Sequence, residues 1–271
     1  MGKAIKLTLL IFVSIVLTFP IYLMVSNSFT ESIGFLEMPP TLIPYQFTLA
    51  NYQRIIQFAY FGRWIANSSF LFVVLMVGCI SISGAAAYVL AVVKSKTTSV
   101  LYWVLLSPLF VPQITIVVAR FIVLSKLGLT GMPAVVLMPL YWAAGVFLFR
   151  NGFKSIPYGF LESARLEGAG EAKIFASIAM PLTKPIVGVS VIMIGGTAFG
   201  DFMWQMLNLK KGKNMTLLVG LATNALNVNT ILDDIGFDLA VGTVLFIPYI
   251  VMFIISSKYF VSGLTAGGLR A

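Results

Sequence analysis

The chain has 271 residues, of which 59% are hydrophobic and only 10% are charged, and its formal net charge is +9. Soluble domains carry about 25% charged residues, so this composition excludes an ordinary soluble domain and indicates a protein of the lipid bilayer. The sequence contains no histidine, which removes the most common metal ligand and general base, and its single cysteine, Cys79, excludes a disulfide framework.

Six apolar stretches are long enough for transmembrane helices, since a hydrocarbon core about 30 Å thick requires roughly 20 residues per helix. They cover approximately residues 5–25, 70–93, 101–123, 133–149, 185–206 and 239–260. The first stretch is too long for a signal peptide and lacks a small-residue cleavage site, so we expect it to be retained. We therefore predict an all-α membrane protein with six transmembrane helices in a single domain, residues 1–271.

The basic residues predict how these helices are oriented. With a cytoplasmic N-terminus, eleven of the 18 Lys and Arg residues lie inside, and the outer segments hold only Arg54, Arg63, Arg120, Lys126, Lys210, Lys211 and Lys213. This bias follows the positive-inside rule and places both termini in the cytoplasm. The inner segments are then a turn at 94–98, a loop at 150–184 and a tail from Val261. The dispersed basic residues have no aromatic platform beside them, which argues against a nucleic-acid partner.

The predicted spans differ from those of ion-coupled carriers. No Asp, Glu, Lys or Arg lies near the middle of a span, although carriers of that kind usually keep ionisable groups at mid-depth. Arg120 and Asp201 lie toward the outer ends. The chain also lacks the G-x-x-x-x-G-K-[ST] phosphate loop, so it cannot hydrolyse ATP by that route. Glycines at 188, 195, 196 and 200 are expected to let neighbouring helices approach closely.

The loop at 150–184 is predicted to contain a helix, a bend and a second helix. Ser155 is a candidate N-cap, and Glu162 can pair with Arg165 at i, i+3 spacing. Gly168 is expected to break the first helix, and a second helix is expected at about Glu171 to Ile178. Such an element can present a carboxylate to a groove in a partner protein. The alternative is an ordinary amphipathic loop at the membrane interface.

The spacing of this loop resembles the cytoplasmic loop of binding-protein-dependent ABC importer permeases, whose pattern is E-A-A-x3-G-x9-I-x-L-P. The chain matches the full spacing with Glu162, Ser163, Ala164, Gly168, Ile178, Met180 and Pro181. Ser163 replaces an alanine and Met180 replaces a leucine, and both changes are mild.

The resemblance extends over nearly the whole chain and is strongest to the carbohydrate importers of this family. Residues 38–44, 47–52 and 63–68 look like the first external segment of those permeases. The run FGDFMWQM at 199–206 looks like a variant of their W-N-D-F-L-W-P-L run. Residues 261–271 resemble the ending of maltose-type permeases that lack an extra N-terminal domain.

The resemblance implies a permease that forms half of the pathway for a mono- or oligosaccharide and has no catalysis of its own. It implies a homologous second permease, two ATPase subunits that bind ATP and Mg, and an external solute-binding protein. It also implies a location in the bacterial or archaeal cytoplasmic (inner) membrane.

The resemblance also assigns roles to residues. Contact with the ATPase falls to Glu162, Ser163, Ala164, Gly168, Ile178 and Pro181 in the loop and to Gly267, Gly268 and Arg270 in the tail. The external segment around Leu221 to Asn229 would reach the binding protein.

Four residues near the outer end of the fifth stretch are candidates for the substrate path, because sugars bind to aromatic faces and polar side chains. They are Phe199, Asp201, Trp204 and Gln205. A competing interpretation is that Trp204 anchors the helix at the membrane interface.

Other functions stay open at this point. A permease for a polyol or a sugar phosphate is one alternative, and an ion-coupled secondary sugar carrier is another. A membrane-embedded enzyme would need an acid–base pair at a common depth, and the scattered acids provide none.

Overall fold

The protein is described by a computed structural model that covers residues 2–30, 42–44, 46–210, 212–229 and 234–268. Within these residues the chain is helical and contains no strand. The helices are α1 (Lys3–Asn27), α2 (Ala50–Ile56), α3 (Phe61–Val92), α4 (Lys96–Leu106), α5 (Gln113–Lys126), α6 (Met132–Leu137), α7 (Ala143–Lys154), α8 (Tyr158–Leu166), α9 (Glu171–Ile174), α10 (Met180–Leu182), α11 (Lys184–Gly200), α12 (Phe202–Asn208), α13 (Leu217–Asn229) and α14 (Ile235–Gly268).

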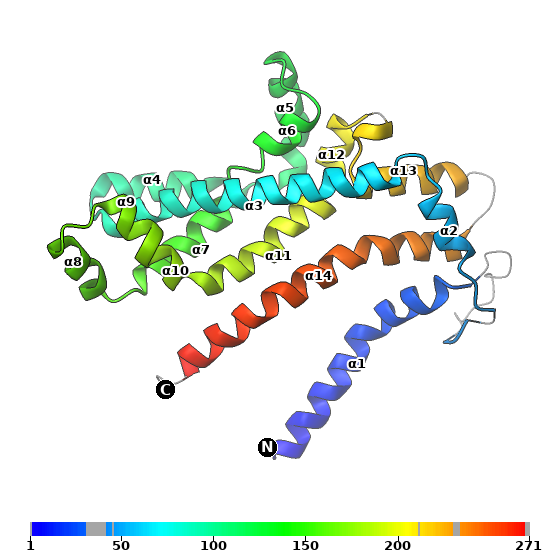
Figure 1. Ribbon diagram of the computed structural model, residues 1–271, viewed down its shortest axis with the longest axis horizontal. Coiled ribbons are helices and arrows are strands. Elements are labelled where there is room, and N and C mark those ends of the chain that lie inside the picture. The colour runs from blue at the N-terminus through cyan, green and yellow to red at the C-terminus, as the bar shows by residue number, and fades with distance from the viewer. Residues whose placement is uncertain (1, 31–41, 45, 211, 230–233, 269–271) are drawn as a thin grey trace.

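The long helices pack in a chain of neighbours, as Figure 1 shows. Helix α3 lies against α7 and α11, α11 lies against α14, and α14 lies against α1. A Cβ atom at Gly188 of α11 would lie 2.7 Å from the Cβ of Tyr259 in α14, an atom fixed to the backbone, so glycine permits the close approach of these two helices. The expected packing role of this glycine is thus confirmed.

The two ends of the molecule carry different short helices. Helices α8 and α9 lie at one end, and α2 and the start of α14 lie at the other (Figure 1). The start of α1 and the end of α14 both point toward the end that carries α8. We call this the inner end and the opposite one the outer end, following the topology predicted from the charges.

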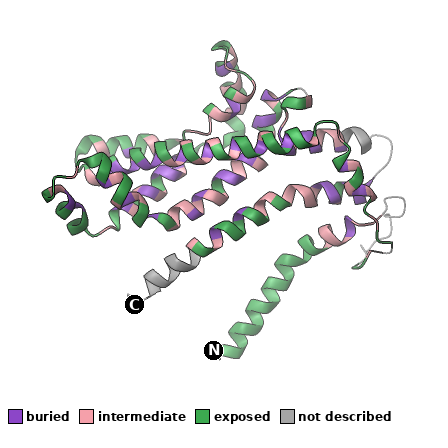
Figure 2. Ribbon diagram, in the orientation of Figure 1, coloured by how far each residue is buried: buried purple, intermediate pink, exposed green. Residues whose placement is uncertain are grey.

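Large apolar side chains cover much of the surface. Figure 2 shows that α1 is exposed along nearly its whole length, whereas the buried residues gather between α3, α7 and α11. The hydroxyl of Ser14 donates to the carbonyl of Leu10 at 2.8 Å, and Thr18 donates to Ser14 at 2.8 Å. Because these polar groups are satisfied within the helix, the outward face of α1 is compatible with lipid or with another apolar helix.

The third predicted stretch is not one straight helix. Helix α4 continues into a 3-10 turn at Ser107–Phe110, and α5 starts at Gln113 after a bend of 103°. Pro108 and Pro112 cause this break, because proline lacks an N–H group and restricts the residue before it.

The fourth and fifth stretches also depart from the predicted bounds. Residues 138–142 separate α6 from α7, so the expected helix at 133–149 is interrupted. Helix α11 ends at Gly200, and the remainder of the expected fifth stretch forms α12. The second helix begins at Phe61, earlier than expected.

Three helices, α1, α3 and α14, are long and apolar enough to cross a membrane within the described residues. The number rises to five if each of two bent pairs is one span, namely residues 96–110 with 113–126 and residues 171–182 with 184–200. An all-helical fold with membrane-spanning helices is therefore confirmed, and the number of six stays a prediction.

Candidate functional site

The loop at the inner end folds as a compact helical unit. Helix α8 is followed by α9, by a π-helical turn at Phe175–Ala179 and by α10, which passes through Pro181 to Leu182. The expected second helix at Glu171 to Ile178 is therefore α-helical only in its first turn. Ser155 does not cap α8, because its hydroxyl donates to the carbonyl of Gly152 at the end of α7.

The inward face of this unit shares a core with three helices of the bundle. Leu161 and Ala164 of α8 and Ile174 of α9 are buried in one cluster with residues of α3, α4 and α7. The members from those helices are Ala87, Tyr88, Leu90, Tyr102, Leu106, Val146, Phe149 and Phe153. A shared core resists separation, since removing a buried Leu side chain typically costs about 2–5 kcal/mol. The unit is consequently anchored to the bundle and is not a loose interfacial loop.

The outward face of α8 carries the glutamate of the predicted motif. Glu162 and Ser163 are exposed, whereas their neighbours Leu161 and Ala164 point into the core. The predicted pairing of Glu162 with Arg165 is wrong, because Arg165 pairs with Glu171 instead. In the described part of the chain, no residue forms a hydrogen bond or an ion pair with the Glu162 carboxylate. This carboxylate is therefore available to a group outside the chain.

A left-handed glycine ends α8, as predicted for Gly168. Its φ angle is +80°, its N–H donates to the carbonyl of Arg165, and the N–H of Ala169 donates to the carbonyl of Ala164, both at 3.0 Å. These two bonds form a Schellman motif, which satisfies carbonyls that the helix leaves unpaired at its end. The side chain of Ala169 packs against the shared core and completes the motif.

Glu171 connects α8, α9 and α3. Its Oε1 accepts a hydrogen bond from Arg165 Nε at 2.7 Å, and its Oε2 accepts one from the Tyr88 hydroxyl at 2.7 Å. The guanidinium of Arg165 and then the Tyr88 hydroxyl lower the pKa of the Glu171 carboxyl, because both stabilise its charged form. This connection could not be predicted from the sequence, since Tyr88 lies 83 residues earlier in the chain.

The remaining residues of the motif, Ile178 and Pro181, differ in burial. Ile178 is half-buried and packs against the shared core, and Pro181 is exposed within α10. The unit ends at Thr183, a buried residue whose hydroxyl donates to the carbonyls of Ala179 and Met180.

The C-terminal tail was also predicted to contact the ATPase. Of the tail residues in that prediction, Gly267 and Gly268 form the end of α14, and Arg270 lies outside the described residues.

The four candidate residues of the substrate path lie at the junction of α11 and α12. Asp201 caps α12, since its Oδ1 accepts a hydrogen bond from the Trp204 N–H at 3.2 Å. Trp204 is buried, and Phe199 is half-buried with its ring 6.0 Å from that of Phe72. These contacts define structural roles for the residues, and their contact with substrate stays a prediction.

Gln205 occupies the position at which the family pattern has proline. Its Nε2 donates to the carbonyls of Thr197 and Ala198 at 3.1 and 3.0 Å, and its Oε1 accepts a hydrogen bond from the Thr216 hydroxyl. The side chain thereby satisfies carbonyls at the end of α11, where the helix has no further N–H donors.

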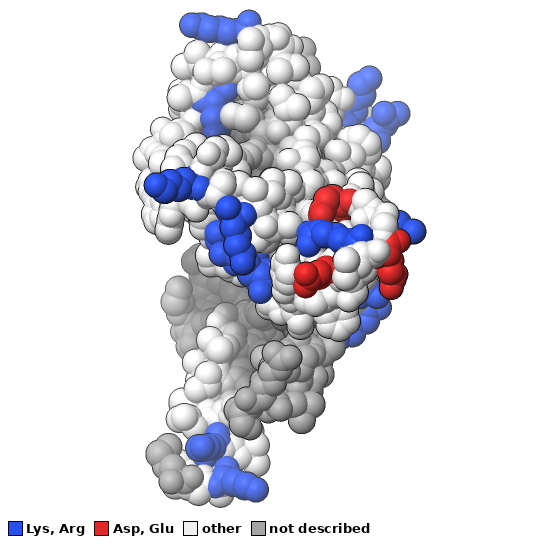
Figure 3. All heavy atoms as spheres, turned by 90° about the vertical axis from the view of Figure 1, so that its left-hand side faces the viewer, with Lys and Arg blue, Asp and Glu red and all other residues white. Residues whose placement is uncertain are grey.

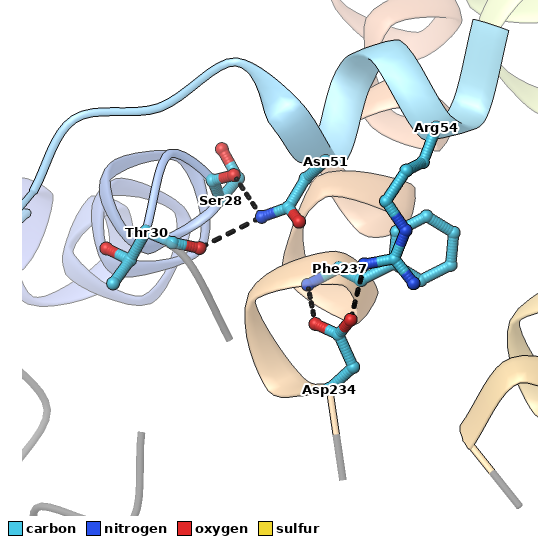
Figure 4. Close-up of polar contacts among 6 residues, drawn as sticks. All are labelled: Ser28, Thr30, Asn51, Arg54, Asp234 and Phe237. Atoms are coloured by element: carbon cyan, nitrogen blue, oxygen red, sulfur yellow. Dashed lines mark hydrogen bonds and ion pairs between the residues drawn. The ribbon is translucent and has the colours of Figure 1, made fainter. Parts of the chain in front are cut away.

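Polar contacts at the outer end connect three helices, and sequence reasoning missed them (Figure 4). Arg54 of α2 forms an ion pair with Asp234, and its guanidinium lies 4.4 Å from the ring centroid of Phe237. The other oxygen of Asp234 accepts a hydrogen bond from the Phe237 N–H at 2.9 Å, at the start of α14. Asn51 donates to the carbonyls of Ser28 and Thr30 after α1, at 3.1 and 2.9 Å. We call these residues the outer tether.

Comparison with known proteins identifies similar chains over nearly the full length. No family model matches the sequence. The arabinooligosaccharides transport system permease protein of Halalkalibacterium halodurans is 28% identical, over 96% of this chain and 93% of the relative. The trehalose/maltose transport system permease protein of Thermococcus litoralis is 29% identical, over 96% of this chain and 94% of the relative. The predicted resemblance to sugar importer permeases is thus confirmed by homologues.

Solved structures agree on the fold. A chain of a bacterial ABC transporter that imports the acidic polysaccharide alginate has a TM-score of 0.79 and 21% identity, and the match covers 96% of this chain and 99% of that one. A second structure shows a bacterial alginate ABC transporter in complex with an alginate pentasaccharide-bound periplasmic protein. Its matching chain has a TM-score of 0.63 and 18% identity, over 95% of this chain and 94% of that one.

Proposed function

We propose that this chain is the membrane-spanning permease subunit of an ATP-driven ABC importer and forms half of the pathway for a mono- or oligosaccharide. The observation that carries this proposal is the inner unit, in which an exposed Glu162 stands on a helix whose opposite face is buried among α3, α4 and α7. A partner that grips α8 from outside would move three helices of the bundle through their shared core. The sugar permeases similar to this chain supply the substrate class.

The proposal includes the partners and the topology. A homologous second permease completes the pathway, two separate ATPase subunits bind ATP and Mg and bind Glu162, and a solute-binding protein delivers the sugar from outside. The chain crosses the cytoplasmic (inner) membrane six times with both termini inside, and it has no catalytic activity itself. The start of α1 and the end of α14 both point toward the end of the molecule that carries α8, and this arrangement supports the proposed topology.

In this mechanism, ATP closes the ATPase dimer and thereby displaces α8. Leu161 and Ala164 transmit the displacement to the shared core, and the Tyr88–Glu171 hydrogen bond transmits it to α3. Because packed cores move between discrete arrangements and do not deform continuously, a small shift at α8 changes the packing of whole helices.

Replacement of Glu162 tests the role of the loop directly. Glu162→Lys places a cation where we propose that a carboxylate binds the ATPase, so sugar uptake should fall at least about tenfold, the scale expected when one partner of a docked charge pair is lost. Glu167→Lys is the matched control, because Glu167 is also an exposed acid of this loop but occupies a position at which the motif specifies no residue type. Uptake of radiolabelled sugar is measured in cells with equal amounts of inserted chain. Wild-type uptake by the Glu162→Lys chain would contradict the proposal.

A further inference from the structure

A pocket at the inner end is lined by basic residues from two separate parts of the chain. Its volume is about 830 Å³, and it lies between the end of α3, the turn before α4, the end of α7 and the first turns of α8. The basic residues that line it are Lys94, Lys96, Arg150 and Lys154, and no acidic residue of the described ranges lines it. The fold brings them together, because α7 packs against both α3 and α4. Their positive charge favours an anionic ligand.

Arg150 is held in place by contacts that leave much of its guanidinium unoccupied. Its Nε donates to the carbonyl of Leu90 at 3.2 Å, and its Cζ lies 3.7 Å from the ring centroid of Tyr102. No carboxylate in the described part of the chain forms an ion pair with Arg150, Lys94, Lys96 or Lys154. A fixed guanidinium with free N–H groups is well suited to phosphate, which it binds through paired hydrogen bonds.

The start of α4 adds a second source of positive potential. Ser95 caps this helix of 11 residues, and its hydroxyl accepts a hydrogen bond from the Thr98 N–H at 3.0 Å. The N-terminus of a helix carries a partial positive charge and exposes N–H groups that bind anions. Both Ser95 and Thr98 line the pocket. The helix dipole and the four basic side chains therefore act on the same space.

The pocket continues into an apolar surface. Ser99 lines it, and Trp103, one helical turn further along α4, has 63% of its surface exposed. Val100 and Val104 of the same helix are exposed to a similar extent. An anion with an apolar tail fits this arrangement, because basic pockets between helices on the cytoplasmic side of membranes bind lipid head groups.

We propose that this pocket binds the phosphate of an anionic phospholipid, with the acyl chains along the exposed face of α4. Figure 3 views the inner end and shows that the red acidic groups gather on one lobe together with some blue basic groups, while further blue groups lie on the neighbouring surface without red ones beside them. Tyr158 and Leu161 of α8 also line the pocket, so the proposed lipid site borders the helix that carries Glu162, although Glu162 itself does not line it. The inference requires only that the chain lies in a membrane, and it does not rest on the proposed transport function.

The experiment uses Trp103 as a reporter of lipid contact. The full chain is reconstituted in phosphatidylcholine vesicles that contain a minority of phosphatidylglycerol with brominated acyl chains, which quench tryptophan fluorescence on contact. The fluorescence of Trp103 is obtained by subtracting the fluorescence of the Trp103→Phe chain from that of the wild-type chain. We expect brominated phosphatidylglycerol to quench Trp103 more strongly than the same fraction of brominated phosphatidylcholine does. In a chain with Lys94→Gln, Lys96→Gln and Lys154→Gln this preference should fall by at least about tenfold, because each lysine near an anionic surface contributes roughly a five-fold preference.

Two controls make the test decisive. Replacement of Lys3, Lys6 and Lys173 by Gln removes the same charge from the inner end outside the pocket, and this variant should keep the preference. Excess inorganic phosphate should not displace the lipid. The proposal is overturned if brominated phosphatidylglycerol shows no preference for Trp103, or if both triple variants lose it equally. Displacement by inorganic phosphate would overturn it in favour of a soluble anion.

Discussion

At the scale of single residues, two glutamates of the inner loop have opposite surroundings. Glu162 faces outward without an internal partner in the described chain, whereas Glu171 is bound by Arg165 and Tyr88. Motif spacing singled out Glu162, and the structure leaves its carboxylate exposed. Motif spacing gave no information on Glu171, because Tyr88, which donates a hydrogen bond to its carboxylate, lies on the distant helix α3. We therefore assign Glu171 a positioning role within the proposed mechanism.

The Glu171 connection predicts a pH dependence of the loop. Its lowered pKa means that the folded loop favours the charged carboxylate, so this stabilisation is present above the ordinary glutamate pKa and is lost as the pH falls through the lowered one. In Glu171→Gln we expect reduced sugar uptake per ATP hydrolysed and a weaker acid dependence of loop stability. The acid dependence of loop stability is measured as the rate at which a protease cleaves the loop between pH 6 and about pH 3. The lower limit lies below the ordinary glutamate pKa of about 4.3.

Tyr88→Phe is the matched variant, since it removes one hydrogen bond and retains the ring that packs on Phe153 and Phe175. It should weaken the loop by about 0.5–1.5 kcal/mol, the usual net contribution of one hydrogen bond. An unchanged acid dependence in Glu171→Gln would contradict the role assigned to this residue.

Gly168 supports a second prediction at this scale. With a φ of +80°, Gly168→Val should destabilise the end of α8 by about 1–2 kcal/mol, because a β-branched residue is strained in the left-handed region. No atom would contact the added Cβ, so the strain comes from the backbone alone. Sugar uptake should fall while insertion is unchanged.

Gly159→Val is the control for Gly168→Val. Gly159 lies within α8 at a negative φ, and its Cβ position is also open. Equal uptake by the two valine variants would show that backbone conformation at Gly168 does not matter.

At the scale of elements, the sequence predicted where helices exist better than where they end. The apolar stretches correspond to α1, α3, α11 and α14, because a long hydrophobic segment can satisfy its backbone in lipid only as a helix. The break near Pro108 was foreseeable from its prolines. The interruption between α6 and α7 has no equally clear signal, since Pro139 is its only proline, and Pro20 and Pro248 remain inside helices.

The outer tether predicts a stability effect far from the inner loop. Asp234 has only 8% of its side chain exposed, so Arg54→Ala removes a charged hydrogen-bond donor from a buried carboxylate. The cost should be about 2 kcal/mol, the scale of one hydrogen bond between charged groups. The melting temperature of the purified chain measures this effect.

Arg63→Ala is the control for Arg54→Ala, because Arg63 is an exposed arginine at the start of α3. Its melting temperature should match that of the wild-type chain. Equal melting temperatures of the Arg54 and Arg63 variants would contradict a stabilising role of the tether.

At the scale of the whole molecule, two surfaces of the chain are open to contacts with lipid or with other chains. Helix α1 is exposed along nearly all its length and contacts α14, as Figure 2 shows. The inner unit presents a carboxylate without an internal partner in the described residues. Both features follow if other chains cover these surfaces. Composition and motif spacing predicted the membrane fold and the family resemblance, and only the structure revealed the shared core through which α8 can move the long helices.

The most direct test of this account is to identify the proteins that accompany the chain. A tagged form is extracted in mild detergent, and the co-purifying proteins are identified by mass spectrometry, with the Glu162→Lys chain in parallel. We predict a second permease and an ATPase with a phosphate-loop motif, and we predict that Glu162→Lys lowers the amount of ATPase while the second permease is retained. A lone chain or homodimer without an ATPase under several gentle conditions would contradict the proposed function and would favour an ion-coupled carrier.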